Sequence, residues 1–177
     1  MSKSLKPAVH SGDHFQGPVD AAIEFVEYGD YQCPHCGRAY PIIKRIQGKL
    51  GKDLKFVFRN FPLSEMHPQA FMAAVATEAA AKQDKFWEMH DILFERQDQL
   101  DLESIVGYAA QIGMNEKTFI KDLEDEKLSA KVEADFESGI HSGVNGTPTF
   151  FINGQRFDGN WDEQHLLAHL KEVLADK

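Results

Sequence analysis

The chain has 177 residues, 42% apolar and 27% charged, as is typical of a globular protein that buries a core without disulfide support. Its net charge of −9 argues against nucleic acid or an anionic membrane as the main partner, and two cysteines exclude a disulfide scaffold. No apolar segment approaches a membrane span and no signal pattern opens the chain, so the sequence as written predicts a cytoplasmic protein. A signal removed from the expressed form would instead make it periplasmic or otherwise extracytoplasmic.

The first third of the chain predicts a strand, a helix and a second strand. Polar residues 1–14 are expected to form a flexible lead-in. The apolar run 21–28 predicts a buried strand, and apolar residues at helical spacing predict a helix over 39–50. The alternating run 54–61 predicts a second strand that Pro62 stops. Two strands joined by a helix imply parallel pairing with a right-handed crossover.

The middle of the chain predicts only helices. Residues 64–141 contain no strand pattern, and Asp101 and Asn115 stand where they can cap two of the helices. The helices are expected over residues 70–82, 86–94, 102–111, 116–124 and 128–140. This segment is therefore predicted to be an all-helical insertion.

The last third predicts a hairpin and a helix. A strand over 149–152 is followed by Asn153-Gly154, a strong signal for a tight turn, and by a returning strand over 155–157. Asp162 is expected to cap a final helix through residue 174. The complete order predicts an α/β (α+β) chain with a sheet domain, residues 15–63 and 142–177, interrupted by the insertion.

Both cysteines stand in one Cys-Pro-His-Cys motif, at the boundary between a predicted strand and a predicted helix. The partial positive charge and unpaired N–H groups of a helix N-terminus stabilise a thiolate there. Pro34 sets φ for the helix start, and His35 can add a positive charge or a hydrogen bond. This arrangement predicts a redox pair, with Cys33 as attacking nucleophile and Cys36 as resolving thiol. Half a zinc site is the weaker alternative, since no second cysteine pair exists.

Several other residues invite a functional interpretation that we do not favour. The aromatic residues of segment 86–94 have helical spacing, which more often indicates core than a peptide groove. Lys55 and Arg59 can pair with Glu24 or Glu27, or remain solvated. No metal site is expected, because the remaining histidines lack convincing ligand spacing with a carboxylate partner: His67, His90, His141, His165 and His169.

The chain resembles the DsbA-like branch of the thioredoxin superfamily. Four segments carry the resemblance: residues 26–36, 58–63, 85–94 and 142–154. The family has a thioredoxin-like sheet with an all-helical insertion, which agrees with the element order. The resemblance implies that Pro148 is a cis-proline facing the cysteine motif, and that Thr147 and Pro148 border a substrate strand.

Two further residues acquire roles through the resemblance. Glu27 lies six residues before Cys33 and matches a buried acidic residue of the family, which would accept the proton of Cys36. Thr147 stands where the familiar periplasmic oxidase has Val and where related isomerases and reductases have Thr. Its hydroxyl could hydrogen-bond the Cys33 sulfur, so the direction of electron flow stays open.

The resemblance implies a thiol-disulfide oxidoreductase that acts on protein or peptide thiols and disulfides. The cysteines suffice for this chemistry, so no dissociable cofactor is expected, but a redox partner must regenerate the active state. The alternative is a redox-gated protein-binding module with the same fold and no turnover.

Overall fold

The structure is a computed structural model that describes residues 3–177, and residues 1 and 2 lie outside the described part. Its contacts divide the chain into two compact units. The sheet unit holds residues 3–29, 38–59 and 138–177, and the helical unit holds residues 30–37 and 60–137. The predicted division gave the helices residues 64–141 alone, whereas the contacts also group the cysteine motif with them.

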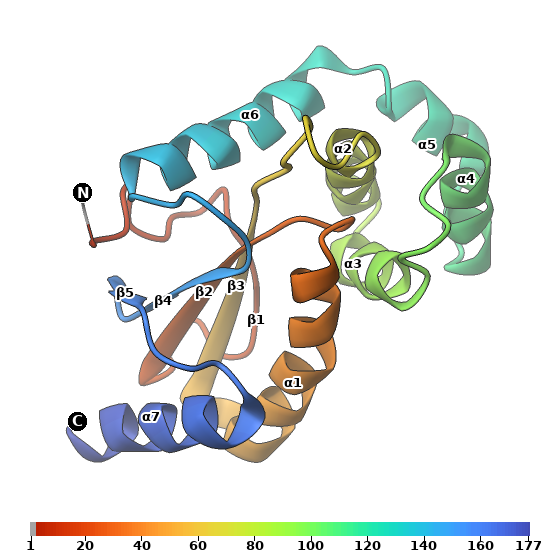
Figure 1. The fold of residues 1–177 in the computed structure, drawn as a ribbon. Helices are drawn as coiled ribbons and strands as arrows, with labels where there is room; N and C mark the ends of the chain where they lie inside the picture. Colours follow the sequence, from red (N-terminus) through yellow and green to blue (C-terminus); the bar gives the residue numbers. More distant parts are fainter. Residues whose placement is uncertain (1–2) are drawn as a thin grey trace. The chain divides into compact units, whose positions relative to one another are not determined.

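The sheet unit is built on five strands in the order β1-β3-β2-β4-β5 (Figure 1). Pairing is antiparallel between β1 and β3, between β2 and β4, and between β4 and β5. Phe25 of β2 lies opposite Ile152 of β4, and Glu27 lies opposite Phe150. The strands are β1 His14–Gln16, β2 Ile23–Gly29, β3 Leu54–Asn60, β4 Thr149–Ile152 and β5 Gln155–Phe157.

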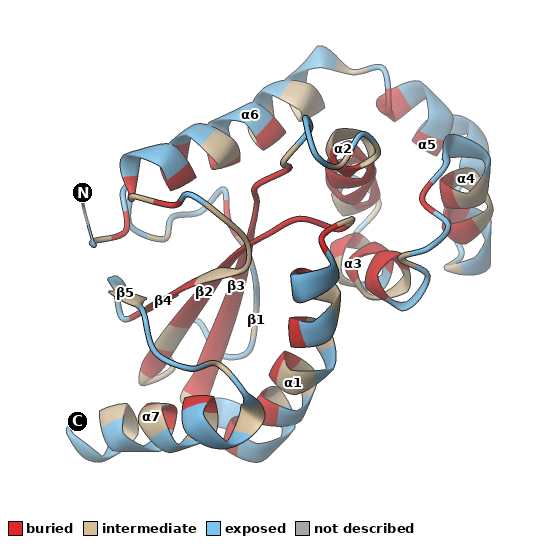
Figure 2. Cartoon of the chain, viewed as in Figure 1, coloured by how far each residue is buried: buried red, intermediate tan, exposed pale blue. Residues whose placement is uncertain are grey.

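The central strands are buried along nearly their whole length, as Figure 2 shows for β2 and β3. A sheet covered on both faces requires near-continuous apolar strands rather than alternating ones, and both runs have that character. Helix α7, Glu163–Ala175, packs on β2 and buries Leu166 and Leu170. Helix α1, Pro34–Leu50, buries Ala39, Ile43, Ile46 and Leu50, whose spacing places them on one face.

Residues 3–16 form hydrogen bonds with the rest of the sheet unit. The prediction that residues 1–14 are a flexible segment is therefore wrong for residues 3–14. The N–H of Leu5 donates to the carbonyl of Gly154, and the N–H of Lys6 donates to Ser142 Oγ. Leu5 is 8% exposed, and β1 was not predicted at all. The sequence of this segment gives no signal for these contacts, because its own periodicity is too short to indicate a strand.

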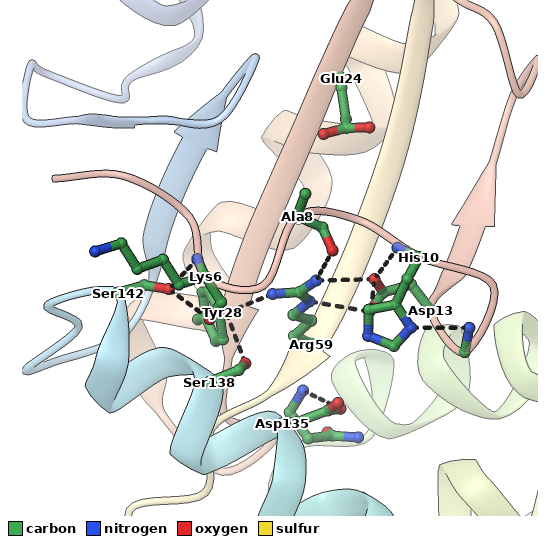
Figure 3. A network of polar contacts seen from close by, with 12 residues as sticks. Lys6, Ala8, His10, Asp13, Glu24, Tyr28, Arg59, Asp135, Ser138 and Ser142 are labelled. Atoms are coloured by element: carbon green, nitrogen blue, oxygen red, sulfur yellow. Dashed lines mark hydrogen bonds and ion pairs between the residues drawn. The ribbon is translucent and has the colours of Figure 1, made fainter. Parts of the chain in front are cut away.

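A buried ion pair joins this segment to β3 (Figure 3). Arg59 Nε and Nη2 each donate to one carboxylate oxygen of Asp13 at 2.9 Å, and both side chains are 1% exposed. Arg59 Nη1 donates to Tyr28 Oη, which lies 2.8 Å from Ser138 Oγ. The sequence left two alternatives for Arg59, a pair with Glu24 or Glu27 or a solvated side chain, and the buried pair with Asp13 contradicts both. Lys55 does pair with Glu24, at 3.6 Å.

The helical unit contains four complete helices and most of a fifth. The Ala-rich α2 buries most of its length, as expected for a helix that is apolar on every side. It contacts α3, α4 and α5, while α3 and α5 also contact α4. The helices are α2 Ala70–Ala81, α3 Phe86–Glu95, α4 Leu102–Gln111, α5 Glu116–Asp122 and α6 Glu126–His141.

The predicted helix caps and the hairpin turn are confirmed. Asp101, Asn115 and Asp162 each accept a hydrogen bond from the backbone N–H three residues later. Asn153 and Gly154 both have positive φ, at 48° and 84°, as a two-residue turn between antiparallel strands requires. Local chemistry therefore sets these boundaries.

Candidate active site

Cys33 directly precedes α1, and Cys36 lies in its first turn. The carbonyl of Cys33 accepts from the N–H of Gly37 at 3.0 Å, so Cys33 takes the position of the helix N-cap. Cys33 is 4% exposed and Cys36 is fully buried, whereas Pro34 and His35 between them are exposed. The sequence predicted this placement at the strand-to-helix boundary, and the helix begins at Pro34 as expected.

A buried carboxylate, Asp30, organises the loop before the cysteines. Its Oδ1 accepts from the backbone N–H of Gln32 at 2.7 Å and of Cys33 at 3.2 Å. Its Oδ2 accepts from the N–H of Leu63 at 2.9 Å and lies 2.8 Å from His67 Nδ1. A carboxylate buried in this way needs several donors to offset its lost hydration, and Asp30 has four.

Asp30 also reaches the second cysteine through its backbone. The N–H of Asp30 donates to Cys36 Sγ at 3.5 Å. A donor that faces a sulfur stabilises its thiolate form over its thiol form. One residue therefore orients the backbone of Cys33 through its side chain and contacts Cys36 through its main chain. The sequence held a local signal for Asp30 that our prediction of the site did not use, because an Asp that accepts from the N–H two residues on, here that of Gln32, forms an Asx turn.

Gln97, in the connection after α3, holds the same loop from the other side. Its Nε2 donates to the carbonyl of Tyr31 at 2.9 Å and to the carbonyl of Cys33 at 2.7 Å. The side-chain amide fills the space beside Gly37, where an added Cβ would lie 2.2 Å from Gln97 Oε1. Position 37 therefore needs glycine as long as Gln97 occupies this space. No sequence pattern indicated Gln97.

Further contacts join the loop to α2 and α3. The N–H of Gln69 donates to Gln32 Oε1 at 2.8 Å, and Tyr31 Oη lies 2.8 Å from His90 Nδ1. The ring of Tyr31 also contacts Phe94, with centroids 4.7 Å apart. The prediction that the residues at helical spacing in α3 belong to the core is confirmed for most of them, while Trp87 is only half-buried. The buried ones are Phe86, Met89, His90, Leu93 and Phe94.

Three residues of the predicted site belong to the sheet unit. Glu27 lies in β2 and is 2% exposed. The Thr147–Pro148 peptide bond is cis, and the pair directly precedes β4. The cysteine motif is grouped with the helical unit, so the structure describes the predicted site in two parts.

Within residues 3–177, no group of three or more His, Cys, Asp or Glu side chains is arranged to hold a metal ion. His67 lies against Asp30, His90 against Tyr31, and His165 Nδ1 is 2.8 Å from Asp162. These histidines have hydrogen-bond partners in the fold or in a helix cap.

Comparison with known proteins assigns the family. The thioredoxin family model matches residues 10–172, nearly the whole chain. The chain belongs to the thioredoxin family. Its fold is that of the DsbA-like thiol-disulfide oxidoreductases of this family, a mixed α/β fold with a five-stranded sheet and helices.

Solved structures agree with this assignment. Oxidised BdbD from Bacillus subtilis is 26% identical, with a TM-score of 0.85, and the match covers 98% of each chain. The protein α-DsbA1 from Wolbachia pipientis also has a TM-score of 0.85, over 96% of this chain and 94% of its own. At 20% identity, that second likeness concerns the fold alone.

The curated relatives carry a different name. The Na⁺/H⁺ antiporter NhaA 1 from Mycolicibacterium vanbaalenii is 42% identical over 171 residues, which is 96% of this chain but 28% of the antiporter. This thioredoxin-family chain therefore spans little more than a quarter of the relatives that it matches. No helix within residues 3–177 is both long and apolar enough to cross a membrane.

Proposed function

We propose that this chain is a thiol-disulfide oxidoreductase that exchanges disulfides with protein or peptide thiols through Cys33 and Cys36. The placement of Cys33 at the N-terminal end of α1, on a loop held by Asp30 and Gln97, carries the proposal. The helix terminus favours the thiolate of Cys33, and a thiolate is both the nucleophile and the better leaving group in exchange.

The proposed reaction begins with a disulfide between Cys33 and Cys36. A substrate thiolate attacks Cys33 Sγ, the bond between the two cysteines breaks, and Cys36 leaves as a thiolate that takes up a proton. A second substrate thiolate then attacks the substrate sulfur of the mixed disulfide and releases the Cys33 thiolate. The substrate loses two electrons, the cysteine pair gains them, and the reverse sequence reduces a substrate disulfide.

The surrounding residues have defined tasks in this proposal. Asp30 fixes the backbone of Cys33 and donates its own N–H to Cys36, the leaving sulfur of the first step. His35 is exposed between the cysteines, where a positive charge or hydrogen bond can favour the thiolate. That Glu27 accepts a proton remains a prediction from the resemblance. The same holds for Thr147 and Pro148 as neighbours of a substrate strand.

The reduction potential of the cysteine pair tests the proposal and its direction. The protein is equilibrated with glutathione buffers, thiols are quenched, and the reduced fraction is measured in the wild type and in Cys33→Ser. A potential near −120 mV would indicate a donor of disulfides, and one near −270 mV would indicate a reductase. Failure of Cys33 and Cys36 to form a reversible couple would refute the proposed function.

Turnover separates this proposal from the alternative of a redox-gated binding module. A dithiol peptide is incubated with catalytic amounts of protein and excess glutathione disulfide, and peptide disulfide is followed over time. Cys33→Ser should abolish turnover in the proposed enzyme, whereas a binding module would show no turnover even as wild type. The antiporter name describes proteins of which this chain matches about a quarter, so we do not propose ion exchange for it.

A further inference from the structure

The helical unit has a surface hollow between the segment after β3 and helix α6. Its volume is about 470 Å³, and the lining is mostly apolar. Leu63, Phe71 and Phe136 are half-buried, and Met66 is 72% exposed. Phe136 stacks on the buried Phe61 with ring centroids 4.3 Å apart, so the floor is anchored to the core. We call this feature the acidic hollow because of its rim.

Three glutamates line the rim: Glu65, Glu133 and Glu137. All three side chains are exposed, and none is in an ion pair within residues 3–177. The neighbouring basic side chain of α6, Lys131, is bound to Asp135 at 2.6 Å. Negative charge is therefore concentrated around an apolar floor, and no Lys, Arg or His of the described residues forms an ion pair with it.

The acidic hollow adjoins the cysteine loop through one carboxylate. Leu63 of the lining donates its N–H to Asp30 Oδ2, while Asp30 Oδ1 accepts from the N–H of Cys33. His67, one residue beyond Met66, lies against the same carboxylate. Leu63 in the lining and Cys33 therefore both donate a backbone N–H to the same buried carboxylate, that of Asp30, in the helical unit.

From this arrangement we propose that the acidic hollow is a substrate subsite for a segment in which an apolar residue stands beside Lys or Arg. The apolar side chain enters the hollow and is thereby removed from solvent, and the cationic group lies on the rim near the glutamates. The segment belongs to the peptide or protein whose cysteine exchanges with Cys33. This inference rests on the proposed disulfide exchange and adds a preference among its substrates.

The test compares cysteine peptides that carry Leu-Lys, Leu-Glu or Ser-Lys before or after the cysteine. The second-order rate constant for reaction with the oxidised protein is measured for each, with glutathione as a small reference thiol. The triple variant Glu65→Gln, Glu133→Gln, Glu137→Gln removes the rim charge. One exposed ion pair changes a binding constant roughly 1.4- to 5-fold, so we expect the triple variant to slow the Leu-Lys peptide about tenfold.

A charge-matched control removes three exposed glutamates from α4, α5 and the residues after α5: Glu103→Gln, Glu116→Gln and Glu124→Gln. This control should keep the preference for Leu-Lys over Leu-Glu, and the glutathione rate should be unchanged in both triple variants. Equal loss of preference in the two variants would attribute it to the net charge of the chain and overturn the proposal. Met66→Ser should weaken the advantage of Leu-Lys over Ser-Lys.

Two further outcomes are decisive. If the wild type does not react even with glutathione, the proposed exchange fails, and the hollow is then tested alone by fluorescence anisotropy with peptides that carry Ser in place of Cys. Absence of a Leu-Lys preference in that binding measurement would overturn the subsite independently. Sedimentation that shows a dimer in the wild type and a monomer in Met66→Ser would assign the hollow to contact between copies and also overturn it.

Discussion

The effect of Gly37→Ala on stability should change sign with the identity of residue 97. Position 37 lies in the first turns of α1, where Ala is favoured over Gly by about 1 kcal/mol when space is available. In the wild type, the new Cβ would lie 2.2 Å from Gln97 Oε1 and 2.9 Å from its Cδ, so the amide must move away.

Displacement of the amide breaks the two hydrogen bonds from Gln97 to the carbonyls of Tyr31 and Cys33. At about 0.5–1.5 kcal/mol each, their loss costs about 1–3 kcal/mol. Gly37→Ala should therefore lower the free energy of unfolding by up to about 2 kcal/mol in the wild type, once the helix gain is subtracted. In a Gln97→Ala background, where the space is open, it should raise that free energy by about 1 kcal/mol.

Urea unfolding of the four proteins in this double-mutant cycle measures the coupling energy directly. The alkylation rate of Cys33 in the same proteins reports whether the hydrogen bonds of Gln97 affect the reactivity of this thiol. Helix propensity alone would leave that rate unchanged. If Gly37→Ala has the same effect in both backgrounds, within about 0.5 kcal/mol, Gln97 does not hold the loop as we infer.

Three other changes test the remaining polar contacts. Asp30→Asn leaves two of its four donors without an acceptor and should cost about 2–5 kcal/mol in urea unfolding, whereas the exposed Asp98→Asn should stay within about 0.5 kcal/mol. Asp13→Asn should lower the free energy of unfolding by about 3–5 kcal/mol, because it leaves the buried charge of Arg59 without its partner. An unchanged midpoint of urea unfolding would contradict that role. Burial by itself raises the pKa of Asp13, but the Arg59 hydrogen bonds and charge hold it below its usual value. The ionised Asp13 therefore makes its full contribution to the free energy of unfolding above about pH 4, and this contribution is lost as the pH falls through the folded pKa. Asp13→Asn should accordingly weaken the decrease of the free energy of unfolding at acid pH. Asp162→Ala removes the N-cap hydrogen bond of α7 and should lower the free energy of unfolding by about 1 kcal/mol, seen as a lower thermal midpoint. An unchanged midpoint would mean that the cap contributes nothing to stability.

The agreement between sequence and structure is closest where short-range chemistry decides. Asp101 and Asp162 cap the helices that follow them, and Asn153-Gly154 turns the hairpin, because each signal depends on residues within four positions. The cysteine motif was located for the same reason, since a helix start beside Cys33 follows from local pattern and from Pro34.

Contacts between distant residues had no such signal. Leu63 and His67 reach Asp30 across 33 and 37 residues, and Gln97 reaches Cys33 across 64. A buried carboxylate or amide satisfies its hydrogen bonds with whichever donors and acceptors the fold brings near, and sequence spacing does not encode that choice. Asp13 was assigned to a flexible segment for the same reason, although it pairs with Arg59 across 46 residues.

By itself, the sequence determined the order of helices and strands apart from β1, together with the helix caps, the hairpin turn and the position of the Cys-Pro-His-Cys motif at the start of α1. These follow from periodicity, capping and backbone preference, which act over a few residues. Only the tertiary structure decided what holds the cysteine loop in place and where charge gathers around an apolar hollow. Those properties depend on burial, which makes each unpaired polar group costly and so selects partners that are distant along the chain.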